Sequence, residues 1–167
     1  MIIRLAKSQD VNRVVEITNA CAMHMISQNI FQWNDKYPNK EIFDKDVLNK
    51  SLFVIEKNSI IIGCLCISSE MDDVYKNVKW LTKNNKNIYL HRLAIHPNFQ
   101  GQGFAISLMN YVEQYSLKNR YESIRLDTFS GNKKNNKFYK LQGYTMLEKI
   151  FFREQSDLPF YCYEKIL

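Results

Sequence analysis

The feature that most constrains the fold is an apolar strand that passes through a glycine turn directly into a helix. Residues 88–95 form the apolar run, Pro97 ends it, and Gly101 and Gly103 form the turn. The segment that follows has the spacing of a helix with one apolar face, made of Ala105, Leu108, Met109 and Val112. The first N–H groups of a helix have no partner within it, and the helix dipole adds about half a positive charge there. Because glycines also let a ligand's oxygens approach the backbone, this junction suits a phosphate group.

Two well-known phosphate-binding motifs do not fit this turn. A Walker loop needs Lys and then Ser or Thr at its end, and neither follows Gly103. A dinucleotide-binding fingerprint needs a third glycine where Ile106 stands, near the front of the chain with a long α/β run after it. A turn that merely tightens the start of a helix satisfies the local pattern as well, so a second motif is needed to decide.

The turn is similar to the acetyl-coenzyme A loop of a known enzyme family. That loop has Arg or Gln, two residues, Gly, one residue, and Gly or Ala, and Gln100, Gly103 and Ala105 match it. The preceding residues 93–97 resemble the strand that leads into it. The family is the GNAT superfamily of N-acetyltransferases.

A second segment carries the resemblance further. Asn132, six intervening residues, Tyr139 and then Gly143-Tyr144 are similar to the later motif of the same family. One departure is Asn135, which stands where that motif usually has a small apolar residue. Both motifs occur in the family's order and spacing, and the surrounding pattern extends the resemblance over essentially the whole chain. It implies one α/β (α+β) domain over residues 1–167, with a central, mostly antiparallel mixed sheet of about six to seven strands flanked by about four helices.

The hydrophobic pattern predicts where these elements lie. We expect strands over residues 1–6, 52–55, 60–67, 88–95, 123–128, 144–152 and 160–165, and helices over residues 8–25, 39–49, 104–119 and 132–143. Ser8 is the expected N-cap of the first helix. The second helix is expected to turn Ile42, Phe43, Val47 and Leu48 inward, and a partial helix within residues 71–87 to turn Val74, Val78 and Leu81 inward.

Composition and charge exclude several other classes of protein. The formal net charge is +6, but the lysines are spread along the chain and the aromatic residues follow no stacking pattern, so nucleic acid is not an expected partner. No apolar run approaches 18 residues and no signal-peptide pattern follows Met1, which predicts a cytoplasmic protein without membrane association. The scattered cysteines have no metal-ligand spacing, so we expect reduced thiols and no metal; they are Cys21, Cys64, Cys66 and Cys162.

The resemblance implies that a substrate amine attacks the thioester of acetyl-CoA directly. Only about one amine in a few thousand is neutral at pH 7 when its pKa is about 10.4, a handicap of roughly 4–5 kcal/mol. The reaction therefore needs a base or a desolvating pocket, a hydrogen-bond donor for the thioester oxygen and a proton for the leaving thiolate. The residues expected to hold the coenzyme are Leu93, Ala94, Ile95, Gln100, Gly101, Gln102, Gly103, Phe104, Ala105 and Asn132.

The roles of the other candidate residues are less closely determined. Tyr139 matches the family's tyrosine and is the candidate acid for the thiolate, although its apolar neighbours also suit a core residue. The base stays open among Glu70, His91 and a water relay. The aromatic segment after the first helix is expected to line a substrate pocket or to pack on the core, and its candidate residues are Gln32, Trp33 and Tyr37. Lys133, Lys134 and Lys137 are candidates for the anionic end of the coenzyme.

Two functions from different classes follow from this pattern. The first is an N-acetyltransferase that acts on a primary amine of a small molecule or a peptide. The alternative is a non-catalytic acyl-CoA-binding module that senses ligand or docks on a partner. The sequence leaves open the amine, the length of the acyl group and the oligomeric state, with a homodimer the commonest assembly.

Overall fold

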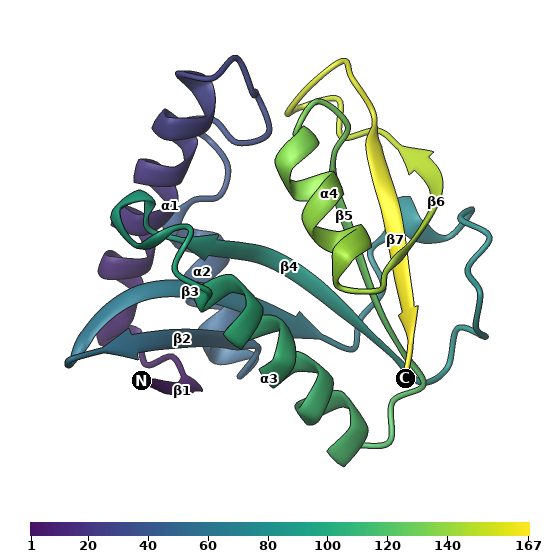
Figure 1. Cartoon of the computed structure of the whole chain (residues 1–167), viewed down its shortest axis with the longest axis horizontal. Coiled ribbons are helices and arrows are strands. Elements are labelled where there is room, and N and C mark those ends of the chain that lie inside the picture. The colour runs from purple at the N-terminus through teal and green to yellow at the C-terminus, as the bar shows by residue number, and fades with distance from the viewer.

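The computed structural model describes residues 1–167 as a seven-stranded sheet with helices on both faces (Figure 1). The strands are β1 (Ile2–Leu5), β2 (Leu52–Lys57), β3 (Ile60–Ser68), β4 (Asn87–Ile95), β5 (Ser123–Phe129), β6 (Thr145–Ile150) and β7 (Phe160–Ile166). The helices are α1 (Val11–Ile26), α2 (Lys40–Leu48), α3 (Phe104–Lys118) and α4 (Lys133–Leu141). The expected fold class is confirmed.

The sheet has the order β1-β2-β3-β4-β5-β7-β6. Every neighbouring pair is antiparallel except β4 and β5, which are parallel. The β2–β3 hairpin turns at Asn58 and Ser59, both of which have positive φ, as a tight two-residue hairpin turn requires. The pattern of strands and turns in the sequence therefore predicted the sheet well.

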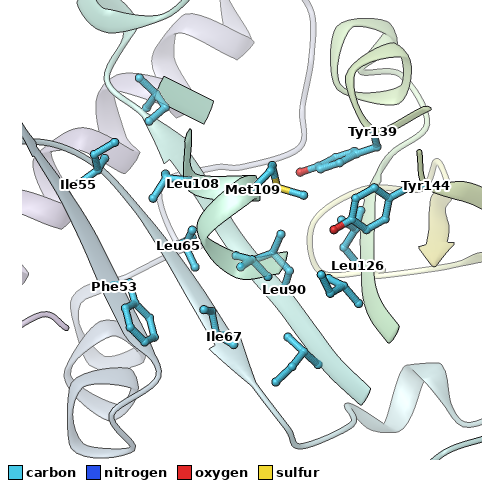
Figure 2. Packing of buried hydrophobic residues seen from close by; sticks show 14 of the residues in the cluster. Phe53, Ile55, Leu65, Ile67, Leu90, Leu108, Met109, Leu126, Tyr139 and Tyr144 are labelled. Carbon is cyan, nitrogen blue, oxygen red and sulfur yellow. The ribbon is translucent and has the colours of Figure 1, made fainter. Parts of the chain in front are cut away.

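Three apolar clusters hold the layers together. Leu108, Met109 and Val112 of α3 pack with residues of β2 to β5 and with Tyr139 in the largest cluster (Figure 2). On the opposite face, α1 and α2 pack against Leu52, Val54, Cys64 and Ala94. A segment without long helices, residues 71–84, covers the same face over β4, β5 and β7, and we call it the cover segment.

A buried ion pair fastens the cover segment to the sheet. Arg125 of β5 and Glu164 of β7 are both fully buried, and the Arg125 Nε donates to the Glu164 Oε1 at 2.9 Å. Arg125 also donates to the Thr82 carbonyl at 2.7 Å, and its guanidinium lies 4.6 Å from the centre of the Trp80 ring. Because an uncompensated charge in such a place is costly, these contacts hold the cover segment where it crosses β4 and β5.

Several local predictions were wrong. Ser8 is not a cap but begins a short 3-10 turn, and the side chain that accepts a backbone N–H is Asp10, from Lys7 at 2.7 Å. Leu48 is 81% exposed, because α2 instead turns Asp46 inward to pair with Arg92. The cover segment has only a 3-10 turn (Asp73–Tyr75), which leaves Leu81 exposed.

Two expectations from the composition concern the cysteines and the possibility of a membrane-spanning helix. All four cysteines are buried and unpaired with one another. None of the helices has the length and apolar character needed to cross a membrane.

Candidate functional site

The site is built where β4 and β5 separate. Their parallel pairing runs from Asn87–Ser123 to Leu90–Leu126 and ends there. Beyond this point β4 continues along β3 and β5 continues along β7, so that the two strands diverge (Figure 1). Arg92 has a φ of 53° where the β3–β4 register shifts, which marks a bulge. A bulge bends its strand and redirects the backbone groups that follow it.

The glycine turn leads from the end of β4 into α3. Gly101 and Gly103 have φ values of 75° and 84°, which favour glycine, and a Cβ on either would meet no atom within 4 Å. None of the backbone N–H groups of residues 101–106 donates to an acceptor in the protein. The turn therefore presents a row of free donors beside open space at a helix N-terminus, as an anionic ligand requires.

A cavity of about 420 Å³ extends from this turn between α1 and α4. Nine of the ten residues expected to hold the coenzyme line it, namely Leu93, Ala94, Ile95, Gln100, Gly101, Gly103, Phe104, Ala105 and Asn132. The exception is Gln102, whose side chain donates to the Asn98 carbonyl at 3.2 Å outside the cavity. Lys134 and Lys137 also line the cavity, whereas Lys133 does not.

Asn132 begins α4 and faces the cavity at the same time. Its Oδ1 accepts the Asn135 N–H at 3.1 Å, so it is the N-cap of this helix. Its Nδ2 donates to the Gln32 Oε1 at 3.0 Å. The structural role of Asn132 is thus established, and its hydrogen bond to a coenzyme stays a prediction.

Tyr139 projects from α4 toward Met109 of α3 (Figure 2). Its ring is packed against Phe138, Tyr144 and Tyr163, at centroid distances of 5.4, 6.0 and 5.8 Å. Its hydroxyl makes no hydrogen bond within the protein, and the side chain lines the cavity. Burial, and then the charge of Asp127, raises the pKa of Tyr139, so its phenol keeps its proton.

Of the three residues expected to form a substrate wall, two line the cavity and one does not. Gln32 and Trp33 line the cavity. Tyr37 does not, because its hydroxyl accepts a hydrogen bond from the Arg92 Nη1 at 3.4 Å, away from the cavity. Residues of α1 and its C-terminal end also line the cavity although no functional role was predicted for them, and they are Cys21, His24, Met25 and Gln28. Cys21 and Met25 belong to the apolar face of α1, and such a face suits a core and a cavity wall equally.

The two predicted base residues lie outside the cavity. Glu70 is exposed after the end of β3. The His91 ring stacks on Tyr75 at 6.3 Å, and burial together with the charge of Arg92 lowers the pKa of His91 to about 3. An imidazole with so low a pKa is a weak base at neutral pH. The geometry thus brings neither residue to the reacting atoms.

Comparisons with known proteins agree with this arrangement. The model of the Acetyltransferase (GNAT) family matches residues 5–144. The chain is 21% identical to the S-alkylcysteine N-acetyltransferase of Bacillus subtilis (strain 168) over 159 residues, which cover 93% of this chain and 83% of that protein.

Two solved structures show the same fold. One is a GNAT-family acetyltransferase from Streptococcus agalactiae, with a TM-score of 0.82 and 22% identity over 99% of this chain and 95% of that one. The other is a Salmonella typhimurium protein determined with its cofactor acetyl-CoA, with a TM-score of 0.73 and 16% identity over 100% of this chain and 94% of that one. With the family model matching most of its length, the chain belongs to the acetyltransferase (GNAT) family.

Proposed function

We propose that the protein transfers an acetyl group from acetyl-CoA to a primary amine of a small molecule or a peptide, by direct attack of the amine. The observation that carries the proposal is one cavity that is lined both by the glycine turn, whose backbone N–H groups are free, and by Tyr139. The acetyl-CoA in the Salmonella relative supports this donor. The S-alkylcysteine N-acetyltransferase relative supports an acceptor that carries an α-amine.

The chain offers a suitable set of groups for the coenzyme. Free backbone donors at the start of α3 suit the pyrophosphate, and the space beside Gly103 leaves room for it. Lys134 and Lys137 place positive charge along the same cavity. The apolar residues 93–95 of β4 line the same cavity as Tyr139.

Two of the three needs of the reaction then have a group to meet them, namely a donor for the thioester oxygen and a proton for the thiolate. Bound acetyl-CoA supplies the acyl group. A backbone N–H of residues 93–95 donates to the thioester oxygen as that oxygen gains charge. The Tyr139 phenol, which keeps its proton at neutral pH, gives that proton to the departing thiolate.

The proposal is tested first by replacing Gly103 with glutamate. The new side chain would point into the open space beside the turn, where its carboxylate repels a phosphate. Acetyl-CoA at about 100 times its dissociation constant should stabilise the wild type by roughly 2.7 kcal/mol, and the variant not at all. Thermal unfolding with and without acetyl-CoA measures both.

A matched control separates lost binding from backbone strain. Gly143 also has a φ of 84° but ends α4 outside the cavity, so Gly143→Glu pays a similar backbone cost and should keep the full coenzyme-induced shift. Equal shifts in both variants would show that the turn does not hold the coenzyme. No shift in the wild type would remove the proposed donor.

The two lysines give a smaller effect that depends on salt. Lys134→Ala with Lys137→Ala should weaken acetyl-CoA binding about three- to tenfold at low ionic strength and less at high ionic strength, because exposed charges contribute little and are screened. Calorimetric titration at two salt concentrations measures this. The same double change at Lys83 and Lys118, exposed lysines outside the cavity, should leave the affinity unaltered at both. Equal losses in the two double variants would contradict the assignment.

A further inference from the structure

One wall of the cavity is not used by the groups proposed to hold the coenzyme. Those groups lie on β4, on the glycine turn, at the start of α3 and on α4. The remaining lining residues all come from α1 and the segment that follows it, and we call them the acceptor wall: Cys21, His24, Met25, Gln28, Ile30, Gln32 and Trp33. Because the cavity extends between α1 and α4, an amine held there would lie between this wall and the coenzyme.

The larger part of the acceptor wall is apolar. Trp33 is only 7% exposed, and Met25 and Ile30 are half-buried. Cys21 is also buried, and its thiol donates to the Ile95 carbonyl at 3.2 Å. Burial raises the pKa of Cys21 to about 12, so that its thiol stays neutral. These side chains can surround an apolar group but cannot neutralise a charged one.

The polar members of the wall are two amides and an imidazole. The Gln28 Nε2 lies 3.1 Å from the His24 Nε2, and the Gln32 Oε1 accepts a hydrogen bond from the Asn132 Nδ2 at 3.0 Å. These groups can form hydrogen bonds with a substrate, but none of them carries a negative charge.

The rest of the cavity does not supply a negative charge either. None of its lining residues is Asp or Glu, and its lysines, Lys134 and Lys137, are cations. A substrate ammonium in this cavity would therefore lose part of its hydration without gaining a carboxylate partner. Such a loss is costly for any ion that is not paired.

This environment acts differently on the attacking amine and on any second amine of the substrate. The attacking nitrogen must be neutral to react, and desolvation without a counter-charge lowers the pKa of an amine, so that its proton leaves to solvent more readily. A second amine gains nothing from losing its proton. At pH 7.5 only about one in 800 such groups is neutral when its pKa is about 10.4, so a second amine adds a penalty of up to that size.

We propose that the acceptor carries a single amine on an apolar, uncharged frame, and that the acceptor wall excludes amines with a second positive charge close to the first. This inference rests on the proposed function and narrows its substrate class. Polyamines and aminoglycosides fall outside that class, as do peptides whose first side chain is basic.

The test uses pairs of amines that differ only by a terminal methyl group in place of a terminal ammonium group. The pairs are hexylamine with 1,5-diaminopentane, L-norleucine with L-ornithine, and two hexapeptides that begin with these two residues. At saturating acetyl-CoA and pH 7.5, the wild type should have a kcat/KM at least about 100-fold higher for the uncharged member of each pair that it acetylates.

The pH dependence of this preference shows whether charge is its cause. Both members of a pair must deprotonate the attacking amine, so that step nearly cancels in the ratio of their kcat/KM values. The neutral fraction of the second amine rises about tenfold for each pH unit below its pKa. The preference should therefore shrink by more than tenfold between pH 7.5 and pH 9. A preference that does not change with pH would reflect shape alone and would overturn the inference.

Gln32→Glu tests the acceptor wall itself. The change adds a carboxylate with almost no change of shape, and that carboxylate can still accept the Asn132 hydrogen bond. It should move the ratio about tenfold toward the diamine, while any effect on coenzyme binding acts on both amines alike. Gln28→Glu, at an exposed position of the same wall, should move the ratio two- to threefold in the same direction. Gln114→Glu, exposed on α3 outside the cavity, should leave it unchanged.

The outcomes separate this inference from the proposed function. Equal kcat/KM values within a pair, or ratios that stay at the wild-type value in both Gln32→Glu and Gln28→Glu, would overturn the inference and leave the acetyl transfer intact. A wild type that acetylates none of the six amines would overturn the proposed function and the inference with it.

Discussion

Replacing Tyr139 with phenylalanine is expected to lower kcat about 10²–10⁴-fold, the range that a positioned acid contributes, while acetyl-CoA binds as tightly as before. The ring of Tyr139 packs against three aromatic neighbours, and phenylalanine keeps that packing. The hydroxyl makes no hydrogen bond within the protein, so its removal leaves no polar group unpaired. Steady-state kinetics and calorimetric titration with acetyl-CoA separate the two effects.

Tyr144 supplies the matched control. It is also a buried tyrosine whose hydroxyl has no partner, and its ring packs on that of Tyr139, but it does not line the cavity. Tyr144→Phe should therefore keep the wild-type kcat. Full turnover in Tyr139→Phe would remove the acid role. A protein that binds acetyl-CoA tightly and acetylates no amine would instead be the non-catalytic acyl-CoA-binding module.

Local sequence patterns were sufficient for the part of the site that is local in sequence. The run from β4 through Gly101 and Gly103 into α3 depends on strand periodicity, a proline stop and glycine turns, all of which act over a few residues. Asn132 stands at the first residue of the predicted helix 132–143, and the structure shows that it caps this helix. The same argument explains why the strands of the sheet could be placed in advance.

The rest of the site depends on contacts between distant residues. Gln32 and Asn132, which both line the cavity, meet across 100 positions. A strand pattern cannot show that β4 and β5 separate after Leu90 and Leu126, so it could not show where the site opens. Nor could the apolar spacing of α1 distinguish a core face from the cavity wall that includes Cys21 and Met25.

The buried ion pair between Arg125 and Glu164 also joins distant residues, so the sequence pattern could not predict it. Breaking this pair is expected to give the largest change in stability. Glu164→Gln is expected to lower the free energy of unfolding by about 3–5 kcal/mol, because it leaves the fully buried Arg125 without its counter-charge. The change also weakens the hydrogen bonds that Thr82 and Ser123 donate to this carboxylate at 2.5 and 2.6 Å. The cover segment, which holds Tyr75, should loosen with it. Urea unfolding measures the loss, and hydrogen exchange of residues 71–84 locates it.

Glu113→Gln is the control. Glu113 pairs with Lys165 at 2.6 Å, and both side chains are about a quarter exposed. Glu113→Gln should therefore lower the free energy of unfolding by less than about 1 kcal/mol.

The pH dependence of stability supplies an independent check. Burial alone would raise the pKa of Glu164, but hydrogen bonds from Ser123, Thr82 and Arg125 outweigh it and hold that pKa below its ordinary value. The stabilisation is therefore complete above about pH 4.3, the ordinary pKa of glutamate, and is lost as the pH falls through the lower value in the folded protein. The difference in stability between wild type and Glu164→Gln should shrink over that same range, and a difference that stays constant down to pH 3 would show that the charge of Glu164 is not its source.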